Sequence, residues 1–266
     1  MQSVHYLIFD VKSFVDAPLA ERLQFSGEES SAASPAKTAS KSKAKTKKKP
    51  DLDFVPYTLQ IPSAVVLAKV SETYELLDIA ALSEVRMQPE EIVERFWLGW
   101  ERYDRPVLVT FNGRESALPL LELSAFRYGL AIPGWFSPVA KNYEWPRNRF
   151  NHSVHIDLMD VFTSFGTTRF VGGLDLAVSL LGRSGWRKTP DQTIWKMHEA
   201  GEFQEIENAC VGDVLSAYFV FLRTRVLAGL LSSAGEKKLV AAARQWLEER
   251  AEATPAFAQY LETWEK

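Results

Sequence analysis

Two aspartates stand where they could hold a divalent cation. Asp10 follows the apolar run VHYLIF of residues 4–9, and Asp213 lies within the apolar stretch CVGDVLSAYFVFL. The first run predicts a buried strand and the second a helix. Several metal-dependent nucleases bind their cation with one carboxylate from a first strand and another from a late helix. The alternative, which spacing alone favours, is that Asp10 caps a turn and Asp213 faces solvent.

A second group of possible ligands lies in the sequence HSVHIDLMD. His152 and His155 are three residues apart and precede Asp157 and Asp160. These side chains could form a metal site, with Asp157 as an outer acid of a cleft. The same spacing is typical of histidines in a turn or on the surface, followed by acids that stabilise the positive end of a helix. We expect this second arrangement.

The elements around these residues predict one α/β domain over residues 1–266. Runs rich in β-branched residues predict strands at residues 4–9, 56–62, 64–70, 74–82 and 106–111. Helical patterns follow at residues 89–103, 118–128, 158–165, 174–181, 206–231 and 235–264. The close succession of the early strands favours antiparallel neighbours. We therefore expect a mixed central sheet flanked by helices.

The net charge of −3 hides a strong difference between one segment and the rest. Residues 35–50 contain seven lysines and no acid, and the other 250 residues carry −10. Residues 27–50 are rich in Lys, Ser and Ala, so we expect a disordered insertion within the domain. Such an arm could bind phosphate groups, and its candidate contacts are Lys45, Lys47, Lys48 and Lys49. The alternative is a solubilising loop.

The composition excludes several classes of protein. No apolar run approaches the roughly 20 residues of a membrane helix, and the N-terminal sequence lacks the basic region of a signal peptide. The one cysteine, Cys210, excludes intrachain disulfides and cysteine metal clusters. We therefore expect a cytoplasmic protein with no membrane partner.

Four blocks of the sequence share the order and spacing of a known family. They are YLIFDVKSF, then VLVTFNGRESALPLLELSAFRYG, then RFNHSVHIDLMDVFTSFG, and finally GLDLAVSLLGRSG with TIWKMHEAGEFQEIENACVGDVLSAYFVFLR. These blocks resemble predicted 3′–5′ exonucleases related to the proofreading domain of family B DNA polymerases. The resemblance implies a ribonuclease H-like fold and, as the family activity, metal-dependent 3′–5′ hydrolysis of phosphodiester bonds.

The resemblance also implies roles for single residues. Exonucleases of this type hold two divalent ions with four carboxylates, and a tyrosine one helical turn before the last Asp orients the attacking water. Asp10 and Asp213 match the first and last carboxylates, which assigns them as catalytic metal ligands. Lys12 replaces the glutamate, Ala117 replaces the aspartate of the second block, and Ala209 replaces the tyrosine.

These replacements predict a dismantled metal site. Magnesium needs several oxygen ligands in near-octahedral geometry, and the Lys12 ammonium repels a cation. If the protein binds a cofactor, we expect Mg²⁺ or Mn²⁺, held weakly by Asp10 and Asp213. The alternative is no cofactor, with Lys12 paired to Asp10 or to Asp213.

Three functions follow from these features. The first is a nucleic-acid-binding protein of the exonuclease family with impaired catalysis. It would bind single strands or 3′ ends through Asn112, Arg114 and the lysine-rich segment. The second is an active exonuclease with a rearranged site that uses Asp10, Asp213 and Asp157. The third is a protein-interaction scaffold on the same fold, whose partner protein the sequence does not identify.

Overall fold

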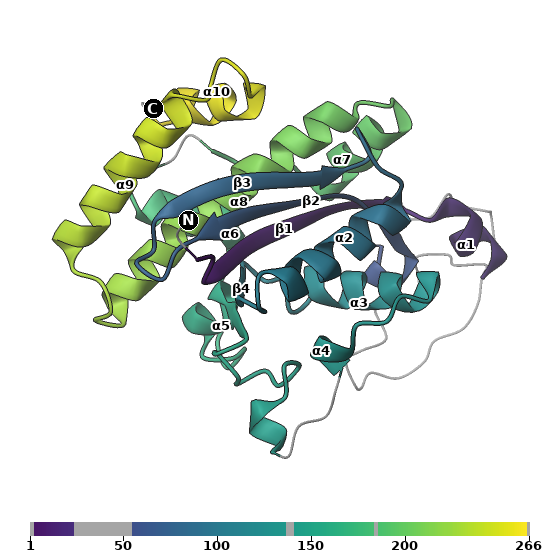
Figure 1. The fold of residues 1–266 in the computed structure, drawn as a ribbon. Coiled ribbons are helices and arrows are strands. Elements are labelled where there is room, and N and C mark those ends of the chain that lie inside the picture. The colour runs from purple at the N-terminus through teal and green to yellow at the C-terminus, as the bar shows by residue number, and fades with distance from the viewer. Residues whose placement is uncertain (1–2, 24–54, 137–140, 184–185, 265–266) are drawn as a thin grey trace, which may run out of the picture.

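The computed structural model describes residues 3–23, 55–136, 141–183 and 186–264. The predicted insertion at residues 27–50 lies outside the described residues. Within them, five strands form one sheet in the order β3-β2-β1-β4-β5 (Figure 1). The strands are β1 Tyr6–Val15, β2 Gln60–Val70, β3 Leu76–Ser83, β4 Val107–Thr110 and β5 His155–Asp157. The pairs β1–β2 and β2–β3 are antiparallel, whereas β4 pairs in parallel with β1 and β5, so the predicted mixed sheet is confirmed.

The first strand is longer than predicted and holds Asp10 in its middle. The sequence predicts a strand over residues 4–9 that ends at Asp10, and this boundary is wrong. The antiparallel pairing with β2 continues to Val15 opposite Gln60, so backbone hydrogen bonds extend β1 through polar residues that the apolar pattern does not identify. In contrast, β4 pairs only with residues 6–8 of β1. Asp10 therefore lies beyond the part of β1 that β4 covers.

A single strand, β2, replaces the two short strands predicted between residues 56 and 70. Part of the first run forms the 3-10 helix η2, Tyr57–Leu59. The strand then runs through Pro62, which lies opposite Ser13 where the register with β1 shifts. Proline has no N–H to donate, and a bulge is one of the few places in a sheet that tolerates it.

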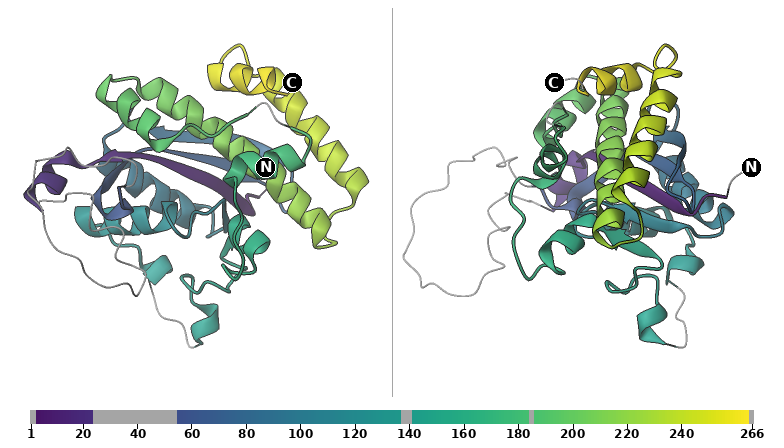
Figure 2. Two further views of the ribbon diagram at one scale, coloured as in Figure 1. Left: turned by 180° about the vertical axis from the view of Figure 1, so that it is seen from behind. Right: turned by 90° about the vertical axis from the view of Figure 1, so that its left-hand side faces the viewer.

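Helices cover both faces of the sheet. Helices α2 (Pro89–Arg102) and α3 (Ala117–Tyr128) pack on one face, and α8 (Phe203–Leu227) packs on the other (Figure 1). The outer side of α8 is covered in turn by α6, α9 and α10 (Figure 2). Because neighbours lie on both of its sides, α8 is buried around most of its circumference.

Several short elements escape prediction from the sequence. The remaining elements, in chain order, are α1 Ala17–Arg22, α4 Pro133–Phe136, η3 Asn142–Glu144, α5 Leu158–Thr163, α6 Gly173–Leu180, α7 Asp191–Glu199, α9 Ser233–Glu248 and α10 Pro255–Glu262. The apolar pattern does not predict α1, α4, α7 or β5, because elements this short depend on tertiary packing.

Among the described residues, none of the helices has both the length and the apolarity that crossing a membrane requires.

Candidate active site

Three charged side chains from β1 and α8 meet inside the protein. The Lys12 ammonium donates a hydrogen bond of 2.8 Å to Oδ2 of Asp10 and another to Oδ2 of Asp213. Lys12 and Asp213 are only 3% and 2% exposed, and Asp10 is 24% exposed. The structure therefore brings together three residues that the sequence singles out, with the ammonium between the two carboxylates. We call these three residues the Lys12 triad.

The periodicity of the strand and the contact with α8 position the triad. Asp10 and Lys12 are two residues apart on β1, so they point to the same face as Ile8, which packs under α8. Helix α8 presents Asp213 to this face. Close to Asp213 on the same helix, the Cys210 thiol donates a 3.4 Å hydrogen bond to the backbone oxygen of Asp10. This contact holds α8 against β1 beside the triad.

Trp186 covers the other side of the Asp213 carboxylate. Its indole N–H donates a 2.8 Å hydrogen bond to Oδ1 of Asp213, so both carboxylate oxygens have a donor. The indole ring lies against Gly212, where an added Cβ would be 2.0 Å from a ring carbon. Glycine at position 212 therefore gives the indole the room to reach Asp213.

The electrostatics of the triad favour a charged Lys12. Burial lowers the pKa of the Lys12 ammonium, but Asp10 and Asp213 outweigh burial and hold the pKa well above its ordinary value. Burial raises the pKa of the Asp10 carboxyl, but Lys12 and Lys188 together bring it below its ordinary value. For Asp213, burial and the charge of Asp10 outweigh Lys12, and its pKa is raised. The triad therefore holds a permanent cation at neutral pH.

The donors of the triad do not fit a divalent cation. Magnesium and manganese need several oxygen ligands, whereas three of the four carboxylate oxygens of Asp10 and Asp213 already accept hydrogen bonds. No group of three or more His, Cys, Asp or Glu side chains within the described parts of the chain could hold a metal ion. The Lys12 ammonium lies between the two carboxylates and repels a second cation.

Two alanines stand at positions to which the exonuclease resemblance gives functional side chains. Ala209 lies on α8 one turn before Asp213 and packs in the apolar cluster between α8 and the sheet. Ala117 is the first residue of α3 and packs in the same cluster as Leu7 and Phe9, on the opposite face of the sheet. A methyl group offers neither a hydroxyl nor a carboxylate, and Ala117 does not join the Lys12 triad.

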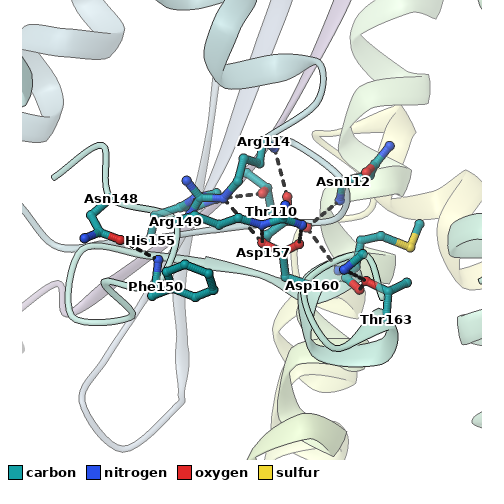
Figure 3. Close-up of polar contacts among 12 residues, drawn as sticks. Thr110, Asn112, Arg114, Asn148, Arg149, Phe150, His155, Asp157, Asp160 and Thr163 are labelled. Carbon is teal, nitrogen blue, oxygen red and sulfur yellow. Dashed lines mark hydrogen bonds and ion pairs between the residues drawn. The ribbon is translucent and has the colours of Figure 1, made fainter. Parts of the chain in front are cut away.

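Asp157 lies in a second polar cluster. It is two strands from β1, about 10 Å across the sheet, and it faces away from α8 because the neighbouring Ile156 packs on the α8 side. Its carboxylate accepts backbone N–H bonds from Asn112, Arg114 and Met159 at 2.8, 2.8 and 3.0 Å (Figure 3). It thus fixes the turn after β4 and caps α5. The expected role at a helix start is confirmed, and the structure does not bring Asp157 to the Lys12 triad.

A buried histidine lies at the centre of this second cluster. Arg114 donates to Nδ1 of His155 at 2.7 Å, so Nδ1 is the acceptor and Nε2 carries the proton donated to Thr110 at 2.8 Å (Figure 3). His155 is completely buried. The expectation of a turn or surface histidine is therefore wrong for His155, because its ring is enclosed by partners from β4 and from the turn after it. It is confirmed for His152, which is exposed.

The candidate nucleic-acid contacts have partners within the protein. The Asn112 side chain donates to Glu115 at 2.9 Å. The Arg114 guanidinium is shared between His155 and Asp160, but it also lines a pocket of about 420 Å³ beside α3 and α4. The other candidates, Lys45, Lys47, Lys48 and Lys49, lie outside the described residues.

Acid is expected to destabilise the protein through His155. Burial, the Arg114 guanidinium and His152 hold the pKa of His155 well below its ordinary value of 6.5. The unfolded chain therefore binds a proton that the folded chain rejects. Stability present above pH 6.5 is lost as the pH falls, at about 1.4 kcal/mol per pH unit. Urea unfolding between about pH 6.5 and 5.5 measures this slope. The non-titrating variant His155→Gln should lack it, and an equal slope in both proteins would contradict the prediction.

Adding a methyl group at Gly212 is expected to displace Trp186. The new Cβ would overlap the ring carbons, so Gly212→Ala should destabilise the protein by about 1–3 kcal/mol in chemical denaturation. Gly99 is a matched control, because it also lies within a helix but an added Cβ there meets no atom within 4 Å. Gly99→Ala should be neutral or stabilising by up to about 1 kcal/mol. Equal effects of the two changes would contradict the close approach of Trp186.

Comparison of the sequence with known protein families assigns the chain to one of them. Residues 52–264 match the family of predicted 3′–5′ exonucleases related to the exonuclease domain of PolB. The chain belongs to this family. A comparison with curated protein sequences gives no match.

The fold of this exonuclease-family chain is also found in a solved polymerase structure. The family B DNA polymerase of the hyperthermophilic archaeon Pyrobaculum calidifontis has a TM-score of 0.52 at 13% identity, over 94% of this chain and 29% of the polymerase. A complex of ExoI with SSB-Ct has a TM-score of 0.34 at 11% identity, over 87% of this chain and 46% of that chain. The chain therefore spans less than half the length of either protein. The polymerase shows the fold alone, and it is the expected ribonuclease H-like fold.

Sequence reasoning about this exonuclease-family chain missed Trp186 as a partner of Asp213. The available signal was Gly212, because an isolated glycine inside an apolar helix indicates that another group approaches closely. That signal does not say which group approaches. Trp186 lies in a segment with no regular pattern, and only the folded chain brings it to α8.

Proposed function

We propose that this member of the exonuclease family binds single-stranded nucleic acid or its 3′ ends and has lost efficient hydrolysis. The observation that carries the proposal is the Lys12 ammonium between the carboxylates of Asp10 and Asp213. Divalent ions activate water and stabilise the developing charge when phosphodiesters are hydrolysed. An ammonium held by two carboxylates supplies positive charge, but it offers no coordination position for a water molecule.

The remaining residues of the site support the loss of catalysis. Ala209 supplies no hydroxyl to orient a water, and Ala117 supplies no carboxylate. The indole N–H of Trp186 already donates a hydrogen bond to the second carboxylate oxygen of Asp213. In this proposal Asp10 and Asp213 keep their motif positions, and their role is to hold Lys12 in the folded protein.

Binding of nucleic acid is proposed on separate grounds. The family relationship suggests a nucleic-acid substrate, and residues 35–50 supply seven lysines. The pocket beside α3 and α4 adds Arg114, Arg147 and two exposed aromatic side chains, Tyr57 and Phe136. Exposed aromatic rings beside arginines can stack bases while the cations contact phosphates.

Binding of a labelled single-stranded oligonucleotide over a salt series tests this part of the proposal. We expect binding at low salt, with log K falling linearly as log salt rises. Replacing the seven lysines of residues 35–50 by glutamine keeps the length of the segment and should make the slope shallower by up to about 5, because each phosphate contact contributes about 0.7. No binding at low salt would favour an interaction scaffold instead, and binding with an unchanged slope would show that the lysine-rich segment does not contact the strand.

A hydrolysis assay separates the proposal from an active exonuclease with a rearranged site. The protein is incubated with an end-labelled single strand and Mg²⁺ or Mn²⁺, and we expect the strand to remain intact. Shortening from the 3′ end that disappears in Asp10→Ala would establish the active alternative.

A further inference from the structure

A polar pocket between α8, α9 and the loop after α6 lies away from the Lys12 triad. Its volume is about 420 Å³, and its lining includes three cationic side chains, Arg183, Arg223 and Lys237. Arg223 follows Asp213 by ten residues on α8, which is about 15 Å along the helix. The pocket is thus separate from the candidate active site.

Arg183 presents a donor without an acceptor. Its guanidinium is stacked between the rings of Phe219 and Trp264, with distances of 4.1 and 3.9 Å to the ring centres. Its Nη1 is buried and has no hydrogen-bond partner among the described residues. A buried, charged N–H without a partner is unfavourable. Arg183 lines the pocket, so its positive charge would attract an oxyanion bound there.

The charge of the pocket indicates the kind of anion. Its three cations are opposed by one acid, Glu236, whose two oxygens accept hydrogen bonds of 2.7 and 2.9 Å from Arg223. The net charge of these four side chains is +2. Ser233, the first residue of α9, places the positive end of that helix dipole at the same pocket. A phosphate monoester carries about −1.5 to −2 at neutral pH and matches this charge better than one carboxylate does.

The rest of the lining is apolar. Leu181, Phe219 and Val240 form part of the wall beside the cations. An apolar wall favours a ligand whose phosphate is attached to an apolar or aromatic group. We propose that this pocket binds a phosphate monoester with such a body, of the size of a nucleoside monophosphate. The inference does not depend on the proposed function, because none of the pocket residues belongs to the Lys12 triad.

Calorimetric titration of the full chain with deoxyadenosine monophosphate tests the inference, with inorganic phosphate as the second probe. We expect saturable binding of the nucleotide, and binding of inorganic phosphate weaker by about tenfold or more because it lacks the aromatic body. Lys237→Glu should weaken nucleotide binding by at least about tenfold. Lys238→Glu is the matched control, since Lys238 is an exposed neighbour on α9 that does not line the pocket.

Three results would overturn the inference. The first is the absence of saturable nucleotide binding at millimolar concentrations. The second is nucleotide binding that Lys237→Glu and Lys238→Glu change equally, which would place the ligand elsewhere. The third is equal affinity for inorganic phosphate and the nucleotide, which would remove the role of the apolar wall. Both lysines are exposed, so neither change threatens the fold.

Discussion

Replacing Lys12 by methionine is expected to destabilise the protein by about 3–5 kcal/mol at neutral pH. Methionine matches the length of the lysine stem but removes the ammonium that pairs with Asp10 and Asp213. Two carboxylates are then left facing each other, and that of Asp213 is almost closed to water. Urea or thermal unfolding of the two proteins measures the difference.

The pair between half-buried Lys69 and exposed Asp78 provides the control. Its N–O distance is also 2.8 Å, but Asp78 is 50% exposed, so Lys69→Met should cost less than about 1 kcal/mol. Equal losses from Lys12→Met and Lys69→Met would show that the Lys12 triad has no special electrostatic role.

The loss of stability in Lys12→Met should depend on pH. Burial raises the pKa of the Asp10 carboxyl, and burial together with the charge of Asp10 raises that of Asp213, while Lys12 opposes both effects. Without Lys12, both folded pKa values rise above the ordinary 3.8. A carboxyl with a raised folded pKa favours the folded state at acid pH and loses that contribution as the pH rises. The loss of unfolding free energy in Lys12→Met should therefore be largest at neutral pH and become smaller toward pH 3.8.

Replacing Lys12 by glutamate is expected to create a divalent-cation site. Three carboxylates from β1 and α8 would then converge where the ammonium now lies, which is the donor set that hard cations prefer. Without metal the variant should be destabilised by repulsion. With Mn²⁺ at about 100 times its dissociation constant, the variant should regain about 2.7 kcal/mol, measured as a rise in Tm. The Tm of the unaltered protein should not respond.

Lys12→Gln separates the metal effect from the loss of the ammonium. Glutamine has nearly the shape of glutamate but adds no third carboxylate, so Mn²⁺ should leave its Tm unchanged. If Lys12→Gln and Lys12→Glu respond to Mn²⁺ alike, the metal binds at another place, and the triad is not the former cation site.

The partners in the Lys12 triad could be predicted from the sequence, but their surroundings could not. Asp10 and Lys12 share one face of a strand by the period of two, and the block order assigns Asp213 to the helix that meets this strand. The sequence does not predict that Lys12 contacts both carboxylates, because that depends on the distance between β1 and α8. Trp186 enters the site from a segment without periodicity.

The second polar cluster shows the same limit. The sequence HSVHIDLMD predicts that Asp157 is an acid at the start of a helix, and this is confirmed by its cap on α5. It does not predict that Arg114 and Thr110 would bury His155, because those contacts join β4, β5 and the turn between β4 and α3 across the sheet. The strand β5 itself has three residues, too few for a periodic pattern.

Calorimetric titration of the unaltered protein with Mn²⁺ tests the central claim most directly. If the Lys12 ammonium holds the place of a metal ion, the protein shows no Mn²⁺ binding at the triad, and Asp213→Ala leaves the titration unchanged. Stoichiometric Mn²⁺ binding that Asp213→Ala abolishes would contradict the account, because a cation would then share the site with Lys12.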